Sequence, residues 1–116
     1  MDWIEIIHLR SYTETDREQA LDAFGQLAMT EAVQSFRGIR LLRDIDLEND
    51  LSIFIYWRGS DHPEGKSPLG LQVASAFSEF GQINHSVWLN AGRISSTAGE
   101  VPPVRTRSKR DQRGPA

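Results

Sequence analysis

The order of the expected strands and helices is the feature that most constrains how this chain can fold. Segments rich in β-branched and aromatic residues predict strands at Trp3–Tyr12, Ile39–Leu47, Leu51–Arg58 and Gln82–Asn90. Segments with apolar residues at helical spacing predict one helix from Thr15 towards Phe36 and another from Pro68 to Phe80. The order β-α-β-β-α-β is that of the split βαβ, ferredoxin-like motif. We therefore expect an α+β fold whose antiparallel sheet, in the order 4-1-3-2, carries both helices on one face.

Capping signals predict where the helices begin and end. Thr15, with Glu18 three residues later, forms a capping box that predicts the start of the first helix. Ser67 followed by Pro68 predicts the start of the second helix, because proline at the first helical position lacks only an N–H that would have no partner there. Gly81 is the expected C-cap of the second helix.

The distribution of charge divides the chain into two parts. The formal net charge is −3 over 116 residues, but residues 1–92 carry 14 acidic and seven basic side chains, and residues 93–116 carry two acidic and six basic ones. The second part has no aromatic residue and contains Pro102-Pro103. It therefore offers too little apolar surface to offset the entropy of ordering it. We expect a folded domain over residues 1–92 and a basic, flexible tail over residues 93–116.

Residue content excludes several classes of function. The chain has no cysteine, which excludes disulfides, a thiol nucleophile and a thiolate metal site. The first residues lack the positive start and apolar run of a secretory signal, and no segment approaches the roughly 20 apolar residues of a membrane span. We expect a cytoplasmic protein without membrane contact. Nucleic acid is not an expected partner, because the body is acidic and the basic tail lacks aromatic residues for stacking bases.

The expected strands carry apolar residues on both faces, which predicts self-association. In the third strand Ile53, Ile55 and Trp57 point one way, whereas Phe54 and Tyr56 point the other. Helices cover only one face of such a sheet, and a large apolar face does not stay in water. We therefore expect a homodimer that packs sheet on sheet.

Residues 1–90 resemble the antibiotic biosynthesis monooxygenase-like family of the dimeric α/β-barrel superfamily. The likeness rests on the first strand, the turn at Phe36-Arg37-Gly38 and the end of the third strand, Ile55-Tyr56-Trp57-Arg58. The resemblance implies a dimeric α/β barrel and oxidation of quinols or polyketides without a cofactor. Two departures matter: Ile55 stands where many members have an acid, and the second helix has no histidine. In the family, haem-degrading members rely on an asparagine in the first strand and on tryptophan and histidine from the second-helix region. This chain has His8 in the first strand and neither residue in the helix, which disfavours a haem-degrading oxygenase.

His8 and His85 are the candidate catalytic residues. They lie in the first and last strands, which are antiparallel neighbours in the expected sheet, and full overlap of the two segments would make them face each other. Such a pair could bind a metal ion, act as a general base or titrate together. Alternatively, each histidine is a hydrogen-bonded structural residue or lies at the dimer seam.

Trp57, Tyr56 and Arg58 are the candidate ligand-binding residues. They end the third strand, where a pocket between sheet and helices would open, and aromatic rings with one cation suit a planar or anionic ligand. The alternative is core packing for Trp57 and solvent exposure for Arg58. Trp3 and Trp88 are expected to pack on a sheet face or at an interface.

The polar loop between the third strand and the second helix contains Asp61, His62 and Glu64. These are residue types that bind metals, but one histidine and two acids in a polar loop are more typical of a solvated surface. We expect no metal site.

The resemblance, with the candidate residues above, implies a cofactor-independent monooxygenase-like protein that acts on a small planar aromatic or quinol substrate. The alternative is a non-catalytic dimeric α/β-barrel protein that binds a ligand or is associated with stress. In both cases the expected partners are a second copy of the chain and a small aromatic molecule.

Overall fold

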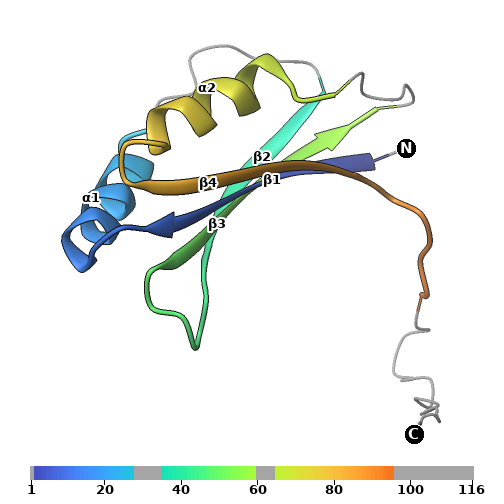
Figure 1. Ribbon diagram of the computed structural model, residues 1–116. Coiled ribbons are helices and arrows are strands. Elements are labelled where there is room, and N and C mark those ends of the chain that lie inside the picture. Colours follow the sequence, from blue (N-terminus) through green and yellow to red (C-terminus); the bar gives the residue numbers. More distant parts are fainter. Residues whose placement is uncertain (1, 28–34, 60–64, 96–116) are drawn as a thin grey trace, which may run out of the picture.

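The computed structural model describes residues 2–27, 35–59 and 65–95 of the chain (Figure 1). Its elements follow in the order β1 (Asp2–Ser11), α1 (Glu14–Gly25), β2 (Phe36–Arg43), β3 (Asp50–Arg58), α2 (Pro68–Phe77) and β4 (Gly81–Leu89). The strands form a four-stranded antiparallel sheet in the order β2-β3-β1-β4. Read from the other edge this is 4-1-3-2, so the predicted βαββαβ fold and sheet order are confirmed.

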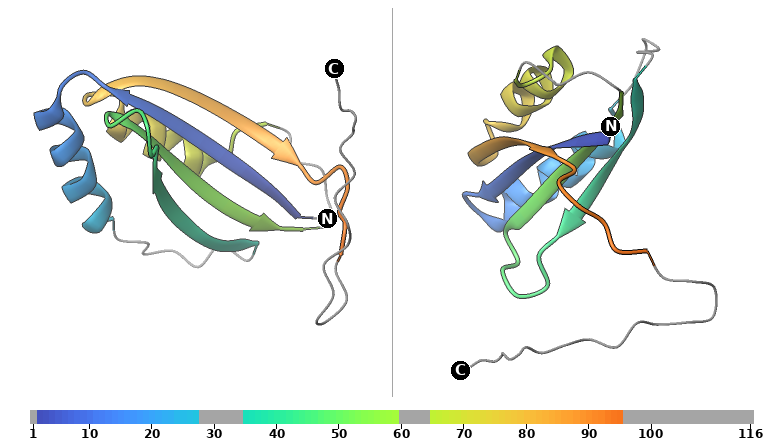
Figure 2. Two further views of the ribbon diagram at one scale, coloured as in Figure 1. Left: turned by 90° about the horizontal axis from the view of Figure 1, so that it is seen from below. Right: turned by 90° about the vertical axis from the view of Figure 1, so that its right-hand side faces the viewer.

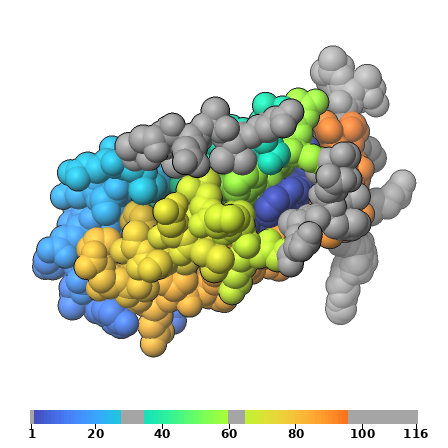
Figure 3. Space-filling model, turned by 90° about the horizontal axis from the view of Figure 1, so that it is seen from above, coloured from blue at the N-terminus to red at the C-terminus, as the bar shows by residue number. Residues whose placement is uncertain are grey.

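Strict alternation of side chains along the central strands gives the sheet two different faces. Odd-numbered residues of β1 and β3 point towards the helices, and those that are apolar form the core with residues of both helices. This core consists of Ile7, Leu9, Ala20, Leu51, Ile53, Ile55, Trp57, Val73 and Phe77. Both helices therefore pack on the same face, with α2 over β1 and β4 and α1 towards the end of β1 (Figures 2 and 3). Even-numbered residues form the opposite face, which we call the open face.

The first helix differs from its prediction at both ends. Thr13, not Thr15, is the N-cap, and its hydroxyl accepts a hydrogen bond from the backbone N of Asp16 at 3.0 Å. The helix ends at Gly25, and Phe36 already belongs to β2. The prediction that this helix continues as far as Phe36 is therefore wrong at its end. Positions 28–34 lie outside the described residues.

The second helix begins as predicted and ends differently. Ser67 is its N-cap, with Pro68 in the first turn. Its C-cap is Ser78, whereas Gly81 is the first residue of β4. A Cβ atom on Gly81 would lie 2.1 Å from the carbonyl oxygen of Arg10. Glycine at this position therefore serves the close approach of β4 to β1 and not the end of the helix.

Two further predictions concern the ends of the chain and its surroundings. Within the described residues, no helix is long and apolar enough to span a membrane. The described part of the predicted tail, residues 93–95, is exposed and has no regular secondary structure. Residues 96–116 lie outside the described residues, so the flexible tail stays a prediction.

Candidate functional site

A carboxylate lies in the core between the sheet and α2. Glu5 is on the helix-facing side of β1, two residues from Trp3 and two from Ile7, and its exposed fraction is 0%. Burial of an ionised carboxylate is costly unless hydrogen-bond donors surround it. The structure must therefore supply such donors around Glu5.

Side chains from β3 and β4 and the start of α2 supply them. Trp57 Nε1 donates to Glu5 Oε1 at 2.9 Å, and the Ser67 hydroxyl donates to the same oxygen. The backbone N of Ser67 donates to Oε2 at 3.1 Å. His85 Nε2 lies 2.8 Å from Oε2, and the His85 side chain is 5% exposed. We call Glu5, Trp57, Ser67 and His85 the Glu5 cluster.

The start of α2 comes unusually close to Glu5. Ser67 caps the helix by accepting a hydrogen bond from the backbone N of Gly70 at 2.9 Å. A Cβ atom on Gly70 would lie 2.1 Å from Glu5 Oε2 and 2.9 Å from His85 Nε2. The missing side chain of Gly70 lets the N-terminal end of α2, where the helix dipole is positive, come close to the carboxylate.

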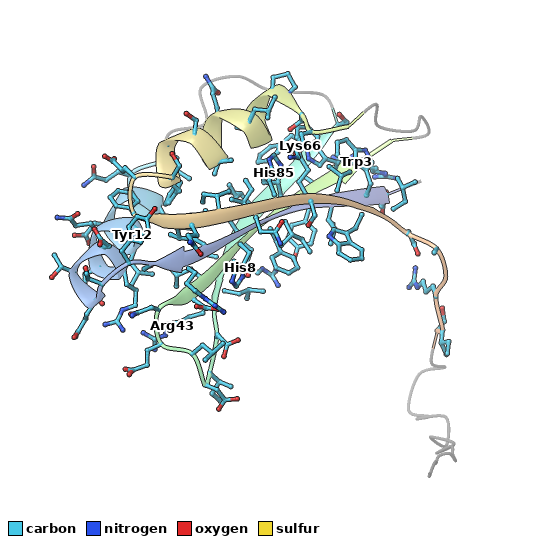
Figure 4. The ribbon with its side chains drawn as sticks, in the orientation of Figure 1. Trp3, His8, Tyr12, Arg43, Lys66 and His85 are labelled. Atoms are coloured by element: carbon cyan, nitrogen blue, oxygen red, sulfur yellow. The ribbon has the colours of Figure 1, made fainter. Side chains whose placement is uncertain are left out.

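The structure separates the two predicted catalytic histidines. In the β1–β4 pairing, His85 is opposite Ile7 and His8 is opposite Asn84. The expected pairing of His8 with His85 is therefore wrong by one residue, and a slip of one residue sends a side chain to the other face. His85 lies beneath α2, whereas His8 lies on the open face (Figure 4).

The predicted ligand-binding residues are divided in the same way. Trp57 is 5% exposed and belongs to the Glu5 cluster. Its ring stacks on Trp3, with centroids 5.2 Å apart and planes at 11°. Tyr56 points to the open face, where Arg40 lies over its ring at 5.7 Å, and Arg58 is exposed. Trp57 and Tyr56 therefore lie on opposite faces of the sheet, because successive side chains of a strand point to opposite faces.

Sequence reasoning did not identify Glu5 or Ser67 as site residues. The signal for Glu5 was present: an acid occupies a position whose neighbours at spacing two, Trp3 and Ile7, are apolar. An acid at a core position of a strand implies buried donors elsewhere in the chain. Ser67 was recognised only as a helix cap, and its bonds to Glu5 depend on tertiary packing.

His8 belongs to a second polar cluster, on the open face. Its Nδ1 lies 3.1 Å from Ser52 Oγ and its Nε2 lies 3.2 Å from Asp50 Oδ2. Arg10 donates to both oxygens of Asp50, at 3.1 and 3.0 Å. These hydrogen bonds from Arg10 hold the pKa of Asp50 below its ordinary value, against the opposing effect of burial, and Asp50 raises the pKa of Arg10.

We expect Asp50 to make stability depend on pH. A carboxyl group with a lowered folded pKa adds stability that is fully present above its unfolded pKa of about 3.9 and is lost as the pH falls through the folded value. Asp50→Asn should lower stability at pH 7 and weaken the further loss below about pH 4. Urea unfolding midpoints of both proteins between pH 7 and pH 3 measure this. Parallel pH profiles would contradict the assignment.

The described residues contain no group of three or more His, Asp or Glu side chains placed to hold a metal ion. The predicted loop residues Asp61, His62 and Glu64 lie outside them. One open hollow of about 240 Å³ lies where β1 begins and β4 ends, and both Trp3 and Trp88 line it. Trp3, which lines this hollow, also stacks on Trp57 of the Glu5 cluster.

Comparison with known proteins identifies solved structures with a similar fold. Rv0793 from Mycobacterium tuberculosis is 19% identical, with a TM-score of 0.54, and the match covers 82% of this chain and 100% of that one. SnoaB, a cofactor-independent oxygenase from Streptomyces nogalater, is 15% identical, with a TM-score of 0.47 over 82% of this chain and 98% of its own. A Bordetella bronchiseptica protein provisionally named antibiotic biosynthesis monooxygenase is 17% identical, with a TM-score of 0.48 over 73% and 94%.

These similarities are structural and do not extend to detectable sequence relationship. No protein-family model matches the chain, and no curated protein is significantly similar to it. At such low identity the likeness establishes the fold alone. The single-chain βαββαβ fold implied by the resemblance to antibiotic biosynthesis monooxygenase-like proteins is confirmed, whereas the dimeric barrel stays a prediction.

Proposed function

We propose that the protein is a cofactor-independent monooxygenase-like enzyme that oxidises a small planar aromatic or quinol substrate, with His85 as the proton acceptor. One observation carries this proposal. His85 is held between the sheet and α2 with Nε2 hydrogen-bonded to Glu5, and within the described residues its Nδ1 has no hydrogen-bond partner. A histidine with one nitrogen oriented by the protein and the other available can act as a general base.

The chemistry requires only proton transfer from the protein. An anthrone loses a proton from its methylene carbon to His85 Nδ1, and the electron-rich anion that results reacts with O2. One oxygen atom becomes a carbonyl oxygen of the quinone, and the other leaves as water with the two hydrogens of the methylene group. The protein's task is to take up the proton, hold the ring and release the proton again.

The aromatic side chains near the base suit such a substrate. Trp57 touches Glu5 directly, and Trp3 stacks on Trp57 and lines the hollow beside Trp88. Indole rings bind planar aromatic molecules by stacking. In this proposal Trp57 contributes to the binding surface, whereas Tyr56, Arg58 and His8 lie on the open face and serve assembly.

The assembly that we propose is a homodimer formed by the open faces of two copies. The centre of the open face consists of apolar side chains that are half-buried, namely Ile4, Ile6, Phe54 and Tyr56. Two exposed apolar side chains, Leu42 and Trp88, lie on the same face. Helices cover the other face, so a second sheet is the natural partner for this one.

One observation favours the alternative, a non-catalytic dimeric protein that binds a ligand. Four donors of the chain itself already reach Glu5, and the His85 side chain is almost fully buried. A buried polar cluster of this kind can serve to hold α2 in place. Thermal stabilisation by an aromatic ligand without turnover would support this alternative.

Exchanging each histidine tests the proposed function. We expect oxygen uptake by the wild-type protein with an anthrone or a quinol, and a loss of at least about a hundredfold in His85→Gln, because general bases typically contribute 10²–10⁴-fold. Glutamine retains an N–H donor for Glu5 but cannot act as a base. His8→Gln, on the opposite face, is the matched control and should keep its activity. Equal activity of the two variants would contradict the role of His85.

A further inference from the structure

The donors around Glu5 constrain where the protons of the cluster lie. Trp57 Nε1 and the backbone N of Ser67 can only donate, and they reach different oxygens of the carboxylate, at 2.9 and 3.1 Å. The Ser67 hydroxyl donates to Oε1 while it accepts from Gly70. Both oxygens of Glu5 are therefore already acceptors before His85 is considered.

The remaining site on Oε2 faces His85 Nε2 at 2.8 Å. An ionised carboxylate has about four lone-pair sites and accepts from every donor present, whereas a protonated one would have to donate at one of them. We infer that Glu5 is a positioning residue that keeps the ring proton of neutral His85 on Nε2 and leaves the lone pair on Nδ1. The assignment of the tautomer does not depend on the proposed function, whereas its role in catalysis rests on that function.

The same carboxylate links the base to α2. Ser67 begins the helix and binds Glu5 through both its backbone N and its hydroxyl. Gly70, in the first turn of α2, lies close to Glu5 and His85. The orientation of the imidazole and the position of α2 therefore depend on one group. In catalytic triads a buried carboxylate likewise holds an imidazole in one tautomer and one orientation.

Nitrogen NMR of ¹⁵N-histidine-labelled protein tests the inference without any substrate. In the wild-type protein we expect neutral His85 as the Nε2–H tautomer, with a slowly exchanging downfield ring proton. Glu5→Gln should lose this proton signal or move it upfield, because the charged acceptor is gone. Asp50→Asn is the matched control, since Asp50 contacts His8 on the open face, and it should leave the His85 signal unchanged.

Kinetics separate positioning from a merely structural role. With an anthrone as substrate, Glu5→Gln should lower kcat tenfold or more and change KM less than threefold. A neutral wild-type His85 protonated on Nδ1, or an unchanged His85 signal in Glu5→Gln, would overturn the inference. The expected NMR result in a protein that never consumes oxygen would support tautomer selection by Glu5 and overturn the proposed function instead.

Discussion

Gly70→Ala is expected to destabilise the protein by roughly 2–4 kcal/mol and to displace the start of α2. The added methyl group would lie 2.1 Å from Glu5 Oε2 and 2.8 Å from the carboxyl carbon. Glu5 cannot move aside, because it is fully buried and four donors hold it. Either hydrogen bonds to the carboxylate break or the helix moves away. The intrinsic gain of alanine over glycine in a helix, about 1 kcal/mol, does not offset this loss.

Gly25→Ala is the matched control for this substitution. Gly25 is also helical, in the last turn of α1. Among the described residues, and apart from its chain neighbours and the backbone of its own helix, nothing lies within 4 Å of the position that its Cβ would take. Alanine there should leave stability unchanged or raise it by up to about 1 kcal/mol. Urea unfolding followed by circular dichroism measures both variants. A Gly70→Ala protein as stable as the Gly25→Ala protein would show that Glu5 and α2 are not in close contact.

The arrangement of strands and helices could be predicted because it depends on local patterns. Runs of β-branched and aromatic residues located the four strands, although the second runs over Phe36–Arg43 and not over Ile39–Leu47. The pair Ser67-Pro68 marks a helix start that the structure confirms. The start of the first helix was misplaced by two residues: Thr15 has the capping-box glutamate, Glu18, but Thr13, which is followed three residues later by Asp16, is the actual N-cap. The choice between them depends on where β1 ends, which is set by long-range hydrogen bonds such as Tyr12 N to Phe80 O at 3.0 Å.

The composition of the site could not be predicted, because it depends on register. β1 and β4 are far apart in the sequence and no hairpin turn sets their alignment, so one residue of error remained. An error of one residue in register moves a side chain to the opposite face of the sheet. The predicted register therefore placed His8 beside His85, whereas the residue that contacts His85 is Glu5. The hydrogen bonds of Glu5 join β1 to β3, to β4 and to the start of α2. No local sequence pattern indicates which residues of these elements meet.

Phe54→Glu is expected to convert a wild-type dimer into a folded monomer. Phe54 lies in the middle of the open face, paired with Ile6 on one side and Arg40 on the other. In the proposed dimer a carboxylate at this position would be buried against the partner's sheet, which costs several kcal/mol for an unpaired charge. Since about 1.4 kcal/mol corresponds to a factor of ten in Kd, dimerisation should weaken at least a hundredfold.

Leu71→Glu supplies the control for this prediction. Leu71 is a comparably large apolar residue, 53% exposed, but it lies on α2, on the other side of the sheet. This variant should sediment as the wild-type dimer at micromolar concentration, while Phe54→Glu sediments as a monomer with unchanged circular dichroism. Two results would contradict the proposed interface: a monomeric wild-type protein, or equal weakening by both substitutions. The second would show that the contact is not confined to the open face, because an open-face interface leaves Leu71 on α2 in water.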